Sequence, residues 1–329
     1  MSGFSNRYVG IVKEASYGTD PGTGYYFGEV DDESIKHTYE VLQRTDMSRY
    51  GAAKSNTGKE FCEGDINMAA INDGFTATVL TGLFPTDTVT GSSPTYTHTF
   101  TEAGTDRSFT LKVGREEKEH TYTGVAVDSL SVSANLNEYA MVSASFMGKA
   151  ESALASVGSS LTGFSSNDPL YFADAKIFFN GNGTASNLVK SISFDINMNR
   201  DGDNACGLGD ATYVRIPPFQ RREITGTIEF NKIVHTAVAS EPTYTQLTSA
   251  DGLELGGSGI ELKVQLGNES VADILTFNFY KIRFEAPDAN VSGRDTQTMT
   301  VPFVALFDTH TDDGKMMDVV MKSEAGSAF

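Results

Sequence analysis

The chain has 329 residues, a formal net charge of −18 and two cysteines. Hydrophobic residues make up 39% of it, enough to fill a core, yet no apolar run approaches the ~18 residues that a membrane-spanning helix requires. The acidic balance argues against holding a phosphate backbone, which needs a surface rich in lysine and arginine. Two cysteines provide no disulfide framework, so the fold must rest on packing.

The first half of the chain predicts short strands, one helix and one long polar loop. Asp73 is a suitable N-cap for the helix, and Pro85 ends it. Leu130, Val132 and Ala134 alternate with polar residues, as in a half-buried strand. The predicted elements are strand Ser34–Arg44, loop Thr45–Lys59, strand Glu60–Ala70, helix Gly74–Phe84, and strands Phe109–Val113, Thr121–Ala134 and Glu138–Gly148.

The second half carries the strongest period-two patterns. Ile192, Phe194 and Ile196 share one face, and Glu223–Phe230 alternates in the same way, which is typical of antiparallel strands with one solvated face. The predicted elements are strand Val189–Arg200, loop Asp201–Arg221, strand Arg222–Lys232, a short helix at Glu241–Leu247, and strands Ile260–Val264, Val271–Glu285 and Thr296–Phe307.

The two halves pass through the same elements in the same order, which predicts an internal duplication. Both reach an Ala-Asn pair, Ala134-Asn135 in one and Ala289-Asn290 in the other. We expect a mainly β fold with two tandem β-sandwich or β-barrel domains, each with a short helix and a long inter-strand loop. The expected divisions are a first domain at 1–148, a linker at 149–167, a second domain at 168–307 and a C-terminal arm or edge strand at 308–329.

The two long loops are the candidate contact sites. They span 15 residues at 45–59 and 21 residues at 201–221, whereas hairpins usually turn in about two to five. Both carry opposed charges and aromatic residues, so we expect arms that reach another subunit, with disordered loops as the alternative. Removal of 201–221 should then leave the chain able to fold. The candidate residues are Asp46, Arg49, Tyr50 and Lys54 in the first loop and Asp201, Asp203, Tyr213, Arg215, Phe219 and Arg221 in the second.

No pattern in the sequence predicts catalysis, a cofactor or a metal site. The five histidines are scattered, and Gly256–Gly259 precedes a predicted strand, whereas a phosphate-binding loop precedes a helix. Asp201–Asn204 is similar to the start of a calcium-binding loop, but Ala205 fills a position that needs a ligand. An acidic turn is the better interpretation, and we predict that the chain is not an enzyme.

Two stretches resemble the tail tube proteins of long, flexible-tailed bacterial and archaeal viruses. The first is Val12–Thr19, with the run Glu-Ala-Ser-Tyr-Gly-Thr, and the second is Tyr122–Gly148, which begins Tyr-Thr-Gly-Val and closes with a strand ending in glycine. The resemblance implies that inner strands of neighbouring copies join into one β-barrel around a channel. It also implies six-fold symmetry, supplied by a trimeric pseudo-hexameric ring, with six chains per ring as the alternative.

The implied function is a structural subunit of the virion tail, assembled in the host cytoplasm. Its partners would be further copies of the chain and the tail proteins at the tube ends. DNA would pass without specific binding, repelled by a negative wall over a screening length of ~8 Å. Two alternatives remain: a monomeric β-sandwich binding module of adhesin or carbohydrate-binding type, disfavoured by the absence of tryptophan, and an enzyme, which would need converging histidines or carboxylates.

Overall fold

The computed structural model describes residues 6–52, 54–92, 95–158, 164, 167–249, 260–268, 273–288, 297–308, 314–323 and 325–329. These residues form a mainly β fold, which confirms the predicted fold class. None of the helices in these ranges is long and apolar enough to cross a membrane.

Strands follow one another along most of the chain, with two short α-helices between them in the described ranges. The first half contains β1 (Tyr8–Lys13), β2 (Tyr26–Gly28), β3 (Val30–Glu33), β4 (Lys36–Arg44), β5 (Lys54–Ala69), α1 (Gly74–Leu83), β6 (Thr86–Ser92), β7 (Thr95–Thr101), β8 (Phe109–Arg115), β9 (Lys118–Asn135), β10 (Met141–Gly148) and β11 (Ala150–Ser156). The second half contains β12 (Lys176–Phe179), β13 (Val189–Asn197), β14 (Glu223–Phe230), α2 (Tyr244–Leu247), β15 (Ile260–Asn268), β16 (Asp273–Phe284), β17 (Met299–Ala305) and β18 (Met317–Ser323).

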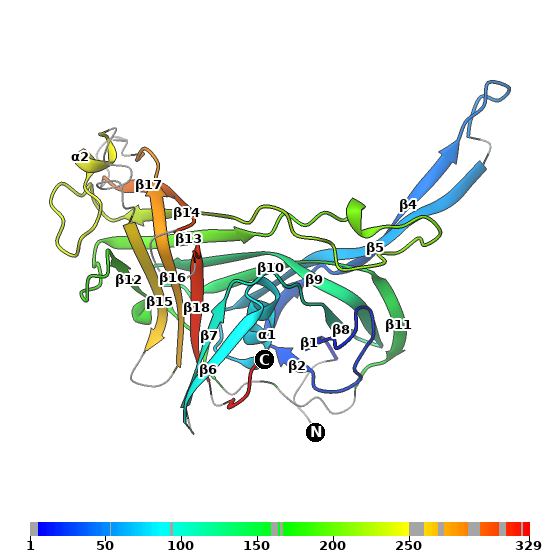
Figure 1. Ribbon diagram of the computed structural model, residues 1–329, viewed down its shortest axis with the longest axis horizontal. Coiled ribbons are helices and arrows are strands. Elements are labelled where there is room, and N and C mark those ends of the chain that lie inside the picture. Colours follow the sequence, from blue (N-terminus) through cyan, green and yellow to red (C-terminus); the bar gives the residue numbers. More distant parts are fainter. Residues whose placement is uncertain are drawn as a thin grey trace.

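A long antiparallel sheet runs through both halves in the order β5–β10–β9–β13–β14–β17, with β3 and β4 on the outer side of β5 (Figure 1). The halves meet at the β9–β13 seam, where Ser129 lies opposite Asn197 and Asn135 opposite Ser191. Strand β9 is long and belongs to two sheets. Its first part pairs with β8 and β11, and its last part pairs with β10 and β13.

Two shorter sheets complete the fold, in the orders β2–β1–β8–β9–β11 and β12–β15–β16–β18–β7–β6. The apolar side of the long sheet packs into the core. Phe194 of β13 meets Phe277 and Phe279 of β16 edge to face, with ring centroids 5.0 and 5.1 Å apart. Aromatic pairs in this arrangement add to the stabilisation by burial.

The same set of strand pairings occurs in each half of the chain. In the first half the pairs are β4–β5, β5–β10, β10–β9, β9–β8, β8–β1 and β9–β11. In the second half they are β13–β14, β14–β17, β17–β16, β16–β15, β15–β12 and β16–β18, in the same sense throughout. This correspondence assigns each described strand of the second half a counterpart in the first, whereas β2, β3, β6 and β7 of the first half have none among those strands.

Both predicted helices are present. Asp73 caps α1 by accepting a hydrogen bond from the Thr76 amide at 2.7 Å, and α1 packs against β1, β2 and β9. The second helix is shorter than predicted. Thr243 is its N-cap and shares a capping box with Gln246, so it begins after Pro242 rather than at Glu241.

Three segments differ from the expectations. Lys54–Lys59, expected in a loop, lie in β5, and the segment expected to be a linker contains β11. Strand β18, expected in an arm or at an edge, pairs with β16 on one side and β7 on the other. Backbone groups paired on both sides make it an interior strand. The Gly256–Gly259 stretch and the Ala289-Asn290 pair lie outside the described residues.

Candidate assembly surfaces and polar sheet face

One face of the long sheet is lined by small polar side chains, and we call it the polar face. On β9 and β10 its residues alternate with a buried apolar set that points into the core. The register places on this face Ser129, Ser131 and Ser133 of β9, Ser143 and Ser145 of β10, Ser191, Ser193, Asp195 and Asn197 of β13, and Thr225 and Thr227 of β14. Sequence reasoning missed it, although serine at every second position was a visible signal.

Hydrogen bonds between neighbouring strands hold these side chains in place. Ser145 donates to Asp65 of β5 at 2.6 Å, and Ser143 donates to Asn67. Asn67 in turn donates to Asp32 of β3 at 2.6 Å. Short side chains fixed in this way leave a smooth hydrophilic wall rather than a set of long mobile groups.

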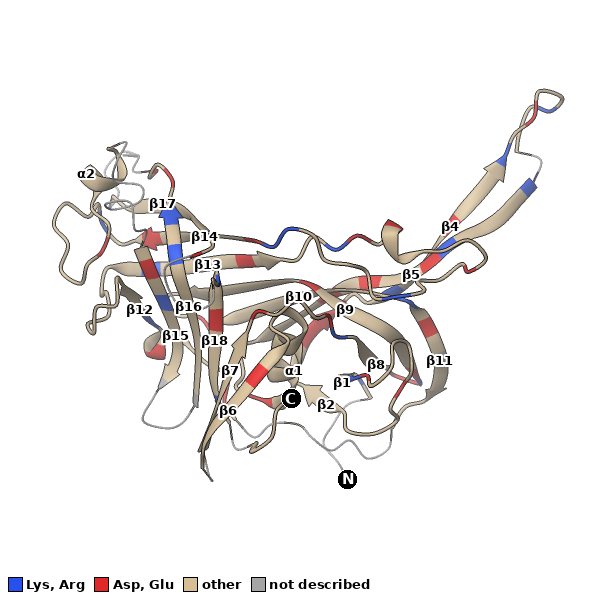
Figure 2. Cartoon of the chain, viewed as in Figure 1, with Lys and Arg blue, Asp and Glu red and all other residues tan. Residues whose placement is uncertain are grey.

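Among the residues that the structure describes, carboxylates outnumber cations on the polar face. Lys190 pairs with Glu229 at 2.8 Å and Lys36 with Glu63 at 3.4 Å, and Arg283 lies opposite Val304 at the far border. Figure 2 shows acidic positions along these strands. The carboxylates on or beside the face are Asp32, Glu63, Asp65, Asp195, Glu223 and Glu229.

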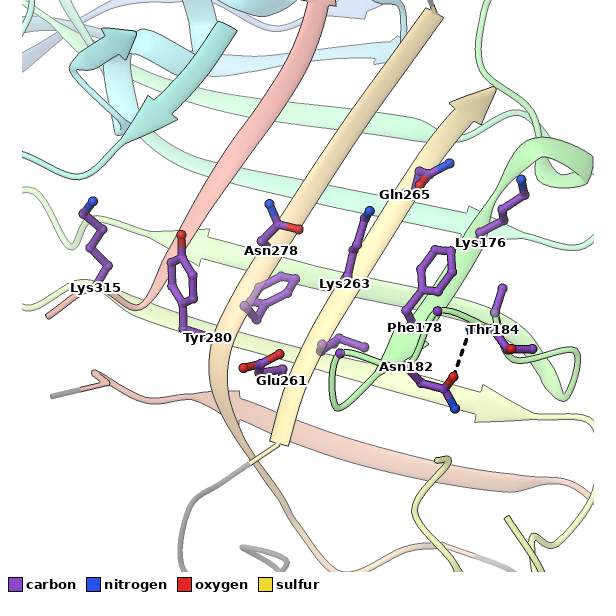
Figure 3. Close-up of a pocket in the computed structure, with 15 residues that line it drawn as sticks. Lys176, Phe178, Asn182, Thr184, Glu261, Lys263, Gln265, Asn278, Tyr280 and Lys315 are labelled. Atoms are coloured by element: carbon purple, nitrogen blue, oxygen red, sulfur yellow. Dashed lines mark hydrogen bonds between the residues drawn. The ribbon is translucent and has the colours of Figure 1, made fainter. Parts of the chain in front are cut away.

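A separate hollow of about 1160 Å³ lies over β12, β15 and β16 (Figure 3). The described residues of its lining include Lys176, Lys263, Lys315 and the carboxylate of Glu261. The Lys263 ammonium lies 5.2 Å from the centre of the Phe178 ring, within cation–π range. The cationic character of this hollow contrasts with the acidic polar face.

The first predicted loop is the tip of a long arm. The outer parts of β4 and β5, together with residues 45–52, extend away from the sheets at one end of the molecule, and we call this segment the arm (Figure 1). Tyr50 and Met47 are fully exposed at its tip, with Arg49 beside them. Asp46 accepts from the Ser48 amide at 3.0 Å, and Lys54 is exposed at the start of β5. These placements suit contact with another molecule.

The second predicted loop lies on the first half instead of projecting. Lys59 of β5 pairs with Asp203 at 2.7 Å, and the Glu60 amide donates to the Ala211 carbonyl at 2.7 Å. Tyr213 is buried, and its ring stacks on Phe61 with centroids 6.0 Å apart. The loop is therefore part of the packed structure, and it covers a section of β5.

Four further residues of this loop also have defined surroundings. Asp201 accepts from the Asn204 amide at 3.1 Å, and Arg215 donates to the Asn204 carbonyl at 2.7 Å. Phe219 is half-buried against the core, whereas Arg221 is exposed. The hydrogen bonds from Asn204 and Gln220 lower the pKa of the Asp201 carboxyl. Hydrogen bonds within the loop therefore add to the contacts that it makes with β5.

The two stretches that carry the family resemblance meet at one buried carboxylate. Glu14 accepts from the amides of Gly18 and Gly124, each at 2.8 Å, and from the hydroxyls of Ser108 and Thr110 at 2.7 and 2.8 Å. Gly18 and Gly124 have φ angles of +72° and +64°, a region that favours glycine. This cluster fixes β1 against β8 and β9, so the shared residues are structural.

These features are typical of a β-sheet structural protein. It has a long solvated sheet face, a projecting arm, and edge strands β3 and β4 at one end of the long sheet. The chain belongs to the phage tail tube protein family, whose model matches residues 5–305. No curated protein sequence matches the chain significantly. The resemblance found in the sequence is confirmed, and the chain is a structural subunit of the virion tail.

Proposed function

We propose that this subunit assembles into stacked rings and that its polar face lines a channel for DNA. The polar face is the observation that carries the proposal: a broad sheet surface of short hydroxyl and amide side chains with an excess of carboxylates. Such a wall offers few apolar contacts to a duplex and repels phosphate over ~8 Å at physiological salt. DNA then moves along it without being held.

We infer that the chain contains two tandem copies of one tube domain. The bounds expected from the sequence, 1–148 and 168–307, are extended to include β11 in the first copy and β18 in the second, because the repeated pairings include β9–β11 and β16–β18. The repeated strand pairings support this division. Two copies per chain favour a ring of three chains with pseudo-hexameric symmetry over a ring of six chains. Such rings would assemble in the host cytoplasm, where other tail proteins would bind the ends of the tube.

The register of the β9–β13 seam predicts the register between chains, where the corresponding strands β16 and β4 would pair. Within the chain, Ile196 of β13 lies opposite Leu130 of β9. In the repeated strand pairings, Ile35, before β4, takes the position of Ile196. Phe284, at the end of β16, takes the position of Leu130. We therefore expect Ile35 of one chain opposite Phe284 of the next. Strands β3 and β4 pair with β5 on one side and form an edge of the sheet. Edge strands of this kind can pair with strands of other chains.

Electron microscopy of the purified protein tests the assembly. We expect hollow rods whose cross-section has six repeating units, with Ser131 and Asp195 on the channel wall. A stable monomer would favour the alternative of a binding module. A tube with the polar face on its outer surface would remove the proposed channel.

Charge reversal on the polar face tests the role in DNA passage. Asp195→Lys combined with Glu223→Lys should leave rods intact but slow DNA ejection, because phosphate is then attracted to the wall. The matched control is Glu261→Lys, which reverses a charge in the hollow over β12, β15 and β16. Equal ejection rates in all three proteins would contradict a channel lined by the polar face.

A further inference from the structure

The 201–215 segment covers part of β5 in the first half of the chain. The equivalent surface of the second half is left uncovered. Lys36 lies opposite Glu63 in the first hairpin as Asn197 lies opposite Glu223 in the second. Counting back from the two glutamates, Lys59 corresponds to Phe219 and Phe61 to Arg221. In the first half, Lys59 and Phe61 are covered by the 201–215 segment through Asp203 and Tyr213.

The surface at Phe219 is open. A hollow of about 690 Å³ lies there, and we call it the Phe219 hollow. Apolar side chains dominate its lining, including Phe219, Leu306 and Phe307, and Phe307 is exposed. Arg222, which pairs with Glu102 at 2.8 Å, forms part of a polar rim. An apolar hollow with a charged rim is the composition expected of a protein contact.

The same correspondence identifies what should fill the hollow. Asp203 follows Asn197 by the same interval as Leu42 follows Lys36, so the counterpart of the 201–215 segment is the arm. The arm does not fold back as the second loop does, and it leaves Tyr39, Val41 and Leu42 exposed on β4. Leu42 has 58% of its surface exposed although it is apolar.

We propose that the Phe219 hollow binds the arm of a second copy of this chain, with Leu42 of one chain against Phe219 of the other. This inference rests on the proposed ring, because the arm would follow the strand that forms the seam between chains. Both partners of the contact differ in polarity between the two positions. Within the chain the pair is charged, Lys59–Asp203, and between chains it would be apolar, Phe219–Leu42. Each pair is matched in polarity, which favours the correct partner.

Exchanging the apolar pair for the charged pair tests the proposal. Leu42→Asp and Phe219→Lys alone should each raise the critical concentration for tube assembly about tenfold or more, since each leaves a charge against an apolar partner. The double variant recreates the pair found within the chain and should recover most of the loss. Losses that simply add in the double variant would overturn the proposal.

Cross-linking keeps the test independent of any folding defect of Phe219→Lys. In a Cys206→Ser background, Leu42→Cys with Phe307→Cys should give covalent multimers with a short bismaleimide in assembled tubes. The control pair, Leu42→Cys with Val238→Cys, uses a residue that is also exposed but does not line the Phe219 hollow. Tubes that form without cross-links at Phe307 would exclude this contact while the tube function stands, whereas absence of tubes from the unaltered chain would reject the tube function itself.

Discussion

At the scale of one residue, Glu14 shows how a short sequence stretch can contribute to the fold through a single buried carboxylate. Four donors from three regions of the first half converge on its buried carboxylate. Glu14→Ala removes the acceptor and leaves those donors buried, so we expect a loss of about 3 kcal/mol or more in the free energy of unfolding. Urea denaturation measures it, with Glu117→Ala, at an exposed turn, as a control that should change stability by under about 0.5 kcal/mol.

Asp73 links the first helix to pH. Burial raises the pKa of its carboxyl to about 6, although hydrogen bonds from Thr76 act in the opposite direction, and the charge of Glu29 adds to the rise. The folded chain therefore binds this proton more tightly than the unfolded chain between about pH 4 and 6. Stability falls as the pH rises through that interval and is level above it.

Asp73→Asn keeps a good N-cap and removes the charge. We expect it to raise the free energy of unfolding at pH 7 by about 1–2 kcal/mol and to flatten the decline between pH 4 and 6. Asp73→Ala loses the cap and should cost about 1 kcal/mol relative to Asp73→Asn. Denaturant unfolding at pH 4.5 and 7.5 measures both effects; an unchanged slope in Asp73→Asn would show that another group carries the pH dependence.

At the scale of elements, the two long loops have become different structures. The first continues β4 and β5 into the arm, and the second is packed on β5 through Tyr213. We therefore expect Tyr213→Ala to cost about 3–5 kcal/mol of stability, whereas Tyr50→Ala should cost almost nothing. Thermal or urea unfolding of the two variants checks this, and equal effects would contradict the difference in packing. Deletion of 201–221, once expected to be tolerated, should destabilise the chain.

The sequence predicted most elements but not their long-range pairing. Glu223–Phe230 matches β14 because its apolar residues alternate strictly, and Asp73 marks the start of α1 because capping is local chemistry. Which strands meet at the β9–β13 seam depends on contacts far apart in the chain, which a local pattern does not encode. The same limit hid the polar face: its serines are visible in the sequence, but only the register brings those of different strands together.

At the scale of the whole molecule, β18 joins the two halves a second time. It lies between β16 of the second half and β7 of the first. Deleting residues 314–329 would expose both neighbours as unpaired edges, and we expect insoluble or aggregated protein. Deleting only 325–329 keeps β18 but removes Phe329, which packs against His98, so it should lower stability while leaving most of the protein soluble. Soluble, folded protein from the longer deletion would show that β18 is dispensable.

The β9–β13 seam has a kinetic consequence. A contact between separate molecules forms at a rate that depends on how many of them are present, but these two partners are tethered and meet at a high effective concentration even when the protein is dilute. In the proposed ring of three, half of the junctions are thus already made when each polypeptide finishes folding. At low protein concentration, such a subunit would begin to polymerise sooner than one that must recruit every neighbour by collision.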